Sequence, residues 1–402
     1  VSRDNEKLAS VMFSTSTIEL NKKAYENNIN KIRDIIGHDV QFSSVIKGNA
    51  YGHGIEEMVS IAEDNGVNHF SVFDANEASR VVRCMSDHSR VMIMGYLGNE
   101  ELEWAVANDV EFFVFEMDRM RKAFEVAVKL NKKAKIHIEV ETGLNRTGFN
   151  KQQLKHVINY LHQHPEYFEV EGLCTHYAGA ESVANHLRVT NQIKNFNQFD
   201  RFIKSKGIVP KLRHTACSAA AVSYPKSRMD MVRIGILQYG YWPSRETFIF
   251  HLKNTMERTD PTQRLITWRS TVMDVKEVNT GEFVGYGTTF LAPENMKIAT
   301  VPVGYSHGYS RSLSNQGRVL IRGKRLAVIG IVNMNLMIVD ISECSEVEKG
   351  DEVVLIGNQG ENEVTVSSFG ELSNQLNYEL LSRLPHDIPR NIVIRERLVE
   401  KQ

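Results

Sequence analysis

The chain has 402 residues, of which 42% are hydrophobic and 24% are charged, so it is long enough for one large domain and a smaller one. The net charge of −1 argues against a general attraction to nucleic acid or to an anionic membrane surface. We expect no membrane span and no signal segment, although a first residue other than methionine leaves a removed leader open.

The four cysteines lie far apart, at Cys84, Cys174, Cys217 and Cys344, without metal-ligand spacing. This pattern predicts reduced thiols in a cytoplasmic protein and no metal site. Cys217 is expected only to pack against its neighbours.

Strands and helices alternate through the first part of the chain. After a polar arm (residues 1–15) and a short strand (17–20), the expected strands are residues 42–46, 69–73, 91–94, 112–115, 136–140, 170–175, 211–215 and 231–235. The helices expected beside them include residues 55–63, 100–107, 119–130, 151–162 and 189–204. Eight such units predict a (β/α)8 barrel of the TIM type over residues 16–257. An open doubly wound sheet is the alternative, but the number of units and the lack of an early glycine fingerprint disfavour it.

The rhythm changes after residue 265, where short runs of period two are separated by Gly, Asn and Asp turns. These runs predict a mostly β C-terminal domain over residues 258–402, with one helix at residues 368–376. The stretch 258–263, rich in Pro, Thr and Arg, is the expected boundary.

A buried strand ends at Lys47, and Gly48, Gly52 and Gly54 follow within seven residues. A lysine there must pair with a charge, lose its proton or be covalently occupied. An amine at the mouth of an apolar barrel suits imine chemistry with an aldehyde cofactor. A lysine that simply reaches solvent is the alternative, and the spacing alone does not decide between them.

Residues 45–54, with the sequence Val-Ile-Lys-Gly-Asn-Ala-Tyr-Gly-His-Gly, resemble the pyridoxal-phosphate lysine motif of the alanine racemase family. The resemblance covers nearly the whole chain and has the same order, barrel first and β domain second. It implies pyridoxal 5'-phosphate as cofactor and a homodimer whose active sites are shared between subunits.

The resemblance also assigns the residues around the cofactor phosphate. It implies that the phosphate is held by Ser218, by the backbone of Gly235 and Ile236, and by Tyr51 and Tyr378. Small side chains follow strand seven, so backbone and the Ser218 hydroxyl are approachable there. The alternative for Ser218 alone is a helix cap.

Arg233 matches the family arginine that faces the pyridine nitrogen of the cofactor. Because a guanidinium keeps its proton near neutral pH, the ring nitrogen stays largely unprotonated and the ring is a weaker electron sink. A carbanion at the substrate α-carbon is then quickly reprotonated, which favours racemisation over transamination. The alternative is an arginine paired with a carboxylate such as Asp230.

Racemisation needs proton donors and acceptors on both faces of the α-carbon. Lys47 supplies one, and residues 283–290 resemble the family segment that carries the second, Tyr286. A free tyrosine has a pKa near 10, so Tyr286 needs help to act as a base. His176 matches the family histidine that links this tyrosine to Arg233, although by itself His176 reads as a core histidine. In the family the tyrosine reaches the partner's barrel.

For the substrate, the resemblance implies that Arg146 touches the cofactor's phenolic oxygen and the carboxylate, which suits a planar guanidinium. The Met334 backbone N–H would bind the same carboxylate, and Tyr305 with Tyr378 would narrow the entrance and favour small side chains.

The chain departs from the family pattern at several positions. Glu139 stands where many relatives carry a carbamylated lysine, so we expect a direct Glu139–Arg146 contact; the alternative is an outward-facing strand glutamate. Ile331, Cys217 and His307 also differ from the common residues, as do Asn333 and Asn335. The loss of charge near the carboxylate pocket puts strict alanine preference in doubt.

The sequence therefore favours an alanine racemase activity that supplies D-alanine for peptidoglycan. The same chemistry on serine or on several small amino acids is a close alternative. A barrel that binds the cofactor without turnover is another, but the β domain with its second base disfavours it. A Schiff-base aldolase or decarboxylase is disfavoured by Arg233.

Overall fold

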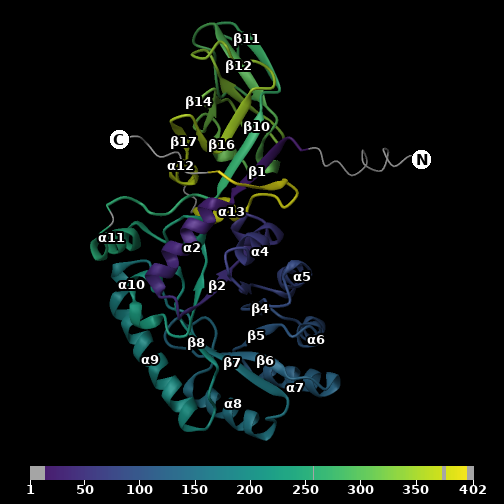
Figure 1. Ribbon diagram of the computed structural model, residues 1–402. Coiled ribbons are helices and arrows are strands. Elements are labelled where there is room, and N and C mark those ends of the chain that lie inside the picture. The colour runs from purple at the N-terminus through teal and green to yellow at the C-terminus, as the bar shows by residue number, and fades with distance from the viewer. Residues whose placement is uncertain (1–13, 257, 374–376, 396–402) are drawn as a thin grey trace, which may run out of the picture. The chain divides into compact units, whose positions relative to one another are not determined.

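The computed structural model describes residues 14–256, 258–373 and 377–395. These residues form two compact units. The barrel unit contains residues 23–50 and 58–264, and the β unit contains residues 14–22, 51–57 and 265–395 (Figure 1). Among the helices within these ranges, none is long and apolar enough to cross a membrane.

The barrel unit is built on eight parallel strands in the order β8-β7-β6-β5-β4-β3-β2-β9. Their bounds are β2 (Gln41–Val45), β3 (His69–Val72), β4 (Arg90–Ile93), β5 (Glu111–Val114), β6 (Ala134–Glu139), β7 (Phe168–Cys174), β8 (Leu212–His214) and β9 (Met231–Ile234). The N–H of Asp230 donates to the carbonyl of Arg213, and that of Arg233 donates to Ala216, so β8 and β9 close the circle. The eight expected strands and the barrel fold are confirmed.

Helices alternate with these strands around the barrel (Figure 1). Their bounds are α2 (Lys22–Ile36), α3 (Lys47–Tyr51), α4 (Ile55–Glu63), α5 (Ala75–Cys84), α6 (Asn99–Ala107), α7 (Met117–Leu130), α8 (Lys151–Gln163), α9 (His186–Ser205), α10 (Ser218–Ser223) and α11 (Arg245–Asn254), with 3-10 turns η1 (Val183–Asn185), η2 (Pro225–Ser227) and η3 (Ile236–Tyr239).

Local sequence explains where these helices begin. The Asn150 side chain accepts from the N–H groups of Gln152 and Gln153, and Gln153 accepts from Asn150 N–H in return. This reciprocal cap satisfies donors that the first turn of α8 cannot pair internally. Asp74 caps α5 in the same way by accepting from Glu77 N–H at 3.0 Å.

The β unit contains a ten-stranded sheet in the order β11-β12-β15-β14-β13-β16-β10-β1-β18, with β17 paired to β16. Its elements are β1 (Ser16–Asn21), β10 (Ile266–Thr271), β11 (Asp274–Val278), β12 (Met296–Val301), β13 (Arg318–Ile321), β14 (Lys324–Ile329), β15 (Met337–Asp340), β16 (Glu352–Gln359), β17 (Asn362–Val364), β18 (Arg390–Val393), α12 (Val366–Ser373), α13 (Asn377–Ser382), and the turns η4 (Tyr305–His307) and η5 (Arg311–Leu313).

The first strand differs from its sequence assignment. β1 pairs antiparallel with β10 and parallel with β18, so it belongs to the β unit, whereas residues 16–257 were assigned to the barrel. The division near the expected linker falls between Arg264 and Leu265. Residues 1–13 of the expected arm and 374–376 of the expected helix lie outside the described residues.

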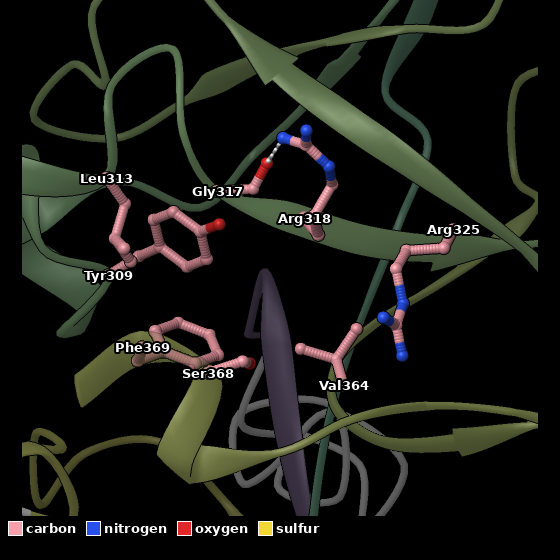
Figure 2. A pocket seen from close by; sticks show the side chains of 8 residues that line it. All are labelled: Tyr309, Leu313, Gly317, Arg318, Arg325, Val364, Ser368 and Phe369. Atoms are coloured by element: carbon pink, nitrogen blue, oxygen red, sulfur yellow. Dashed lines mark hydrogen bonds between the residues drawn. The ribbon is translucent and has the colours of Figure 1, made fainter. Parts of the chain in front are cut away.

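The β unit has its own core around Trp268, Tyr309 and Phe369. The rings of Tyr309 and Phe369 meet edge to face at 5.3 Å between centroids. Both line a cavity of about 50 Å³, together with Leu313, Gly317, Arg318, Arg325, Val364 and Ser368 (Figure 2). The Tyr309 hydroxyl is buried without a hydrogen-bond partner in the described part of the chain, and this burial raises its pKa. One water molecule would fit such a space.

Candidate active site

Lys47 stands directly after β2, at the carboxyl end of the barrel, where active sites of this architecture lie. The chain then turns left-handed, with positive φ at every residue from Gly48 to Gly52. Asn49, Ala50 and Tyr51 adopt this conformation at a cost of about 1–2 kcal/mol each. Strain concentrated at one loop commonly marks a functional site.

Contacts from neighbouring elements hold this turn in place. The Glu77 carboxylate on α5 accepts hydrogen bonds from the N–H groups of Gly48 at 2.6 Å and Asn49 at 3.3 Å. On the strand side, Gln238 Nε2 and the Tyr239 hydroxyl both donate to the carbonyl of Val45 at 3.1 Å. The residues on each side of Lys47 are therefore fixed by side chains distant in sequence.

The Lys47 amino group lies in a positive environment. Desolvation of the ammonium and the charge of Arg146 lower its pKa most, and Arg233 adds to this effect. Glu77 opposes them. The side chain as a whole is still exposed, so the amine is reachable. A lysine with a depressed pKa is a better nucleophile at neutral pH.

Arg233 is buried on β9, and its two terminal nitrogens are fully engaged. Nη1 contacts His214 Nδ1 and donates to the His214 carbonyl at 2.9 Å, while Nη2 donates to the Thr175 carbonyl at 2.7 Å. Within the described residues, Nε–H donates to no protein acceptor. Asp230, the alternative partner, instead pairs with Arg213 at 2.8 Å.

His176 follows β7 and lies close to these cations. Burial lowers its pKa to about 3, with further contributions from Arg233, Arg146 and Lys47. Its ring is therefore neutral at physiological pH. The carbonyl of His176 accepts from Gln192, but no hydrogen bond joins its ring to Arg233 in the described structure. His176 and Arg233 thus interact electrostatically, but the expected direct hydrogen bond between them is not formed in the described structure.

The residues expected at the phosphate come together at the ends of β8 and β9. The Ser218 hydroxyl, at the start of α10, accepts from Gly235 N–H at 2.9 Å. Ile236 begins the next turn, η3. Gly235 N–H is therefore already engaged, which leaves the Ser218 hydroxyl proton and the Ile236 backbone as the groups available to an anion.

The expected Glu139–Arg146 contact is wrong. Glu139 is buried at the end of β6, where burial raises its pKa and a hydrogen bond with Thr147 opposes that rise. Arg146 is exposed, and no ion pair joins the two within the described residues. Gly143 and Asn145 between them, and Gly148 just beyond, have positive φ, and the loop leaves Arg146 at the surface. The outward-facing alternative for Glu139 is also wrong.

In the β unit, Tyr286 lies on the loop between β11 and β12. Val284 N–H donates to the Phe290 carbonyl at 3.0 Å and closes the base of the loop. Gly285 and Gly287 have positive φ on either side, and the Tyr286 side chain is 73% exposed. The loop thus presents a phenol away from its own unit.

Tyr305 and Met334 lie on two loops that contact each other. Tyr305 N–H donates to the Asn333 carbonyl at 2.9 Å, and Ser306 N–H donates to the Met334 carbonyl at 3.0 Å. A Cβ at Gly304 would overlap these carbonyls, so only glycine permits the approach.

Tyr51 and Tyr378 also lie together in the β unit, with ring centroids 6.0 Å apart.

Three residues suit pyridoxal phosphate by their chemistry. Lys47 is an amine with a lowered pKa, Arg233 is permanently charged and its Nε–H has no acceptor in the described residues, and Ser218 offers a hydroxyl at the start of α10. Sequence reasoning missed Glu77, Gln238 and the contact of His214 with Arg233. Their partners lie far along the chain, so no local pattern marks them.

The chain matches two family models. The first is described as the alanine racemase N-terminal domain and matches residues 20–243. The second is described as the alanine racemase C-terminal domain and matches residues 265–392. Together they cover both units.

Relatives and solved structures agree. The alanine racemase of Leptospira interrogans is 32% identical over 383 residues, covering 94% of this chain and 96% of its own length. The structure of alanine racemase from Bacillus anthracis with bound L-Ala-P has a TM-score of 0.87 at 28% identity, over 97% and 98% of the two chains. The Bartonella henselae alanine racemase with covalently bound pyridoxal phosphate shares the fold, with a TM-score of 0.80 at 21% identity over 95% and 100%.

The charges around Lys47 predict opposite shifts in two variants. Arg146→Met should raise the pKa of Lys47, because a positive neighbour is removed, and Glu77→Gln should lower it. The measurement is the pH dependence of the rate at which Lys47 reacts with pyridoxal phosphate, followed by visible absorbance. Arg121→Met, on the exposed face of α7, is the control and should leave the midpoint unchanged. Shifts in the same direction for both variants would contradict this electrostatic account.

Proposed function

Since the chain belongs to the alanine racemase family and is an isomerase acting on amino acids, we propose that it interconverts L-alanine and D-alanine with pyridoxal 5'-phosphate as cofactor. We assign the two acid–base groups to Lys47 and Tyr286. The observation that carries the proposal is that the barrel unit contains both Lys47, whose pKa is lowered, and the buried Arg233, whose Nε–H has no partner in the described residues.

When bound, pyridoxal phosphate supplies an aldehyde that joins to amines and a ring that withdraws electrons from the substrate α-carbon. The Ser218 hydroxyl and the Ile236 backbone would bind its phosphate, with Tyr51 and Tyr378 as the contribution of the β unit. Arg233 would donate from Nε to the ring nitrogen and keep it unprotonated, because a guanidinium does not release its proton. His176, neutral beside Arg233, would orient the second base.

The two bases are chemically matched to opposite faces of one carbon. The depressed pKa of Lys47 makes its neutral amine easier to form, which suits a group that takes a proton and returns it. Tyr286 projects from its loop, which suits a group that acts outside its own unit. By likeness to the family we propose that it serves the partner's barrel, so that the functional protein is a homodimer.

The substrate carboxylate has two proposed contacts. Arg146 would bind it by a planar fork, and the Met334 N–H would add a backbone donor. Tyr305 would limit the size of the side chain that enters. We propose that the D-alanine formed serves peptidoglycan synthesis. A cytoplasmic location stays a prediction, with which four free cysteines agree.

A broader racemase that also accepts serine is the second candidate. It is favoured by the exposure of Tyr305 and Met334 and by the uncharged Asn333 and Asn335 beside them. Relative rates of D-amino acid formation from a panel of L-amino acids distinguish the two. Rates on serine below about one hundredth of those on alanine would exclude it.

Lys47→Ala should abolish both the cofactor-dependent visible absorbance and racemisation, because no other amine takes its place at the strand end. Absorbance spectra and D-alanine production are measured on the same sample. Lys23→Ala, exposed in the first turn of α2, is the matched control and should retain both. Retention of racemisation without Lys47 would overturn the proposal.

Tyr286→Phe should keep the cofactor but lose proton exchange at one enantiomer far more than at the other. The reason is that each base serves one face of the α-carbon. The measurement is incorporation of deuterium from solvent into L-alanine and D-alanine separately. Phe283→Leu, on the same loop, controls for disturbance of the loop. Equal loss of exchange in both enantiomers would contradict the two-base scheme.

Shared active sites predict complementation between inactive variants. When Lys47→Ala and Tyr286→Phe chains are co-expressed, each mixed dimer should hold one intact site. Random pairing then restores about one quarter of the wild-type sites. Differently tagged chains allow the mixed dimer to be purified and assayed. Activity that stays at the level of the separate variants would place both bases in one chain.

A further inference from the structure

A continuous line of hydrogen-bonding side chains runs inside the barrel from Arg233 to Glu111. Arg233 contacts His214 Nδ1, and His214 Nε2 lies 2.8 Å from His137 Nδ1. His137 Nε2 lies 2.8 Å from Glu111 Oε2, which also accepts from His69 Nε2 at 3.2 Å. The paired residues come from β9, β8, β6, β5 and β3, and several of these strands are not neighbours in the sheet. The line therefore crosses the interior of the barrel.

The protons in this line can take only one direction. A guanidinium donates and cannot accept, so His214 Nδ1 must be the acceptor. A neutral His214 then carries its proton on Nε2, and this N–H donates a hydrogen bond to His137 Nδ1. His137 in turn carries its proton on Nε2, and that N–H donates a hydrogen bond to Glu111. A second proton on either ring would set two donors against each other.

The charges agree with this direction. Burial lowers the pKa of His214 and His137, and the charge of Arg233 lowers that of His214 further. Burial alone would raise the pKa of Glu111, but hydrogen bonds from His137 and His69 lower it instead. Both ring positions between Arg233 and Glu111 are therefore neutral, and the two ends carry opposite charges.

No carboxylate forms an ion pair with Arg233 in the described residues, although its charge opposes the rise that burial causes in the pKa of Glu139. Arg233 is only 4% exposed. Its other partners are the carbonyls of His214, Thr175 and Thr215. Phe113 covers one side, with the guanidinium carbon 5.8 Å from the ring centroid. A charge buried this deeply is costly unless it is compensated. Glu111 is the anion to which its hydrogen bonds lead, although Glu111 Oε1 also lies 3.1 Å from Arg90 Nη1.

The strand between the two histidines leaves room for this line. Gly172 pairs with His137 across a β-bulge in which Glu171 is the extra residue. A Cβ at Gly172 would lie 2.8 Å from His214 Nε2 and closer still to His137 Nδ1. Its φ is not in the left-handed region, so the requirement for glycine is one of space. A side chain here would separate the two rings.

We propose that Glu111 is a positioning residue that acts as the remote counter-ion of Arg233 through His137 and His214. It fixes both imidazole tautomers and thereby the orientation in which Arg233 presents Nε–H to the cofactor ring. The proposal rests on the proposed function only for the identity of that ring. The tautomers of His137 and His214 are a property of the folded protein and do not depend on whether it turns over a substrate.

The first test is made on the unmodified protein with 15N-labelled histidine. The chain has 14 histidines, so His137→Asn and His214→Asn serve to assign the two signals. Both rings are expected to be neutral with the proton on Nε2 at pH 7. A charged ring, or a proton on Nδ1 of His214, overturns the proposal. This result is independent of racemisation, so failure of the proposed function would be seen separately, as absence of activity in the wild type.

The second test compares two glutamates at the same end of the barrel. Glu111→Gln should release the His137 tautomer and reduce kcat about tenfold, with KM within about twofold. Glu171→Gln is the control, because Glu171 is buried and contacts Arg90 and Lys211 but neither histidine. It should keep wild-type tautomers and kcat. Equal loss of kcat in both variants, or unchanged tautomers in Glu111→Gln, would reduce Glu111 to a structural role and overturn the proposal.

A third variant breaks the line without changing charge. Gly172→Ala should part the two rings and lower kcat as Glu111→Gln does, while Glu111 stays in place. Wild-type kcat and tautomers in Gly172→Ala would contradict a role for the contact between His137 and His214.

Discussion

Arg233 places a positive charge inside the barrel, and the polar groups around it stabilise that charge by accepting its hydrogen bonds. Three carbonyls and one imidazole engage its terminal nitrogens, and within the described residues Nε–H donates to no protein acceptor. A lysine here could not serve, because burial would lower its pKa and it lacks the fixed fork. Under the proposed function, the permanent charge of this arginine would make the cofactor ring a weak electron sink, which suits racemisation.

The same positive field acts on Lys47. Arg146 and Arg233 lower its pKa, and Glu77 limits that effect while holding the left-handed turn. The turn stores strain in Asn49 and the residues after it, and the contacts of Glu77 and Gln238 on both sides offset that cost. Position and reactivity of the amine are thus set together rather than by the lysine motif alone.

The residues proposed to act belong to different units. Lys47, Arg233 and Ser218 lie in the barrel unit, whereas Tyr286, Tyr305 and Met334 lie on loops of the β unit. Lys47 and Arg233 lie on or just after barrel strands, and Ser218 begins α10. The β-unit residues are exposed, and Tyr286 stands between Gly285 and Gly287, as suits groups that meet a substrate.

From the sequence alone, the eight barrel strands, the β domain and a lysine at the end of a barrel strand can be predicted, because periodicity and a dense local motif are properties of adjacent residues. The sequence did not determine the partner of β1, since the alternating burial of that strand fits either sheet and its pairing is with β10. The family resemblance predicted a contact between Glu139 and Arg146, but the fold buries Glu139 and leaves Arg146 exposed. His214 and His137 are 77 residues apart, so only the closed barrel, which brings distant strands around one interior, decided that they meet.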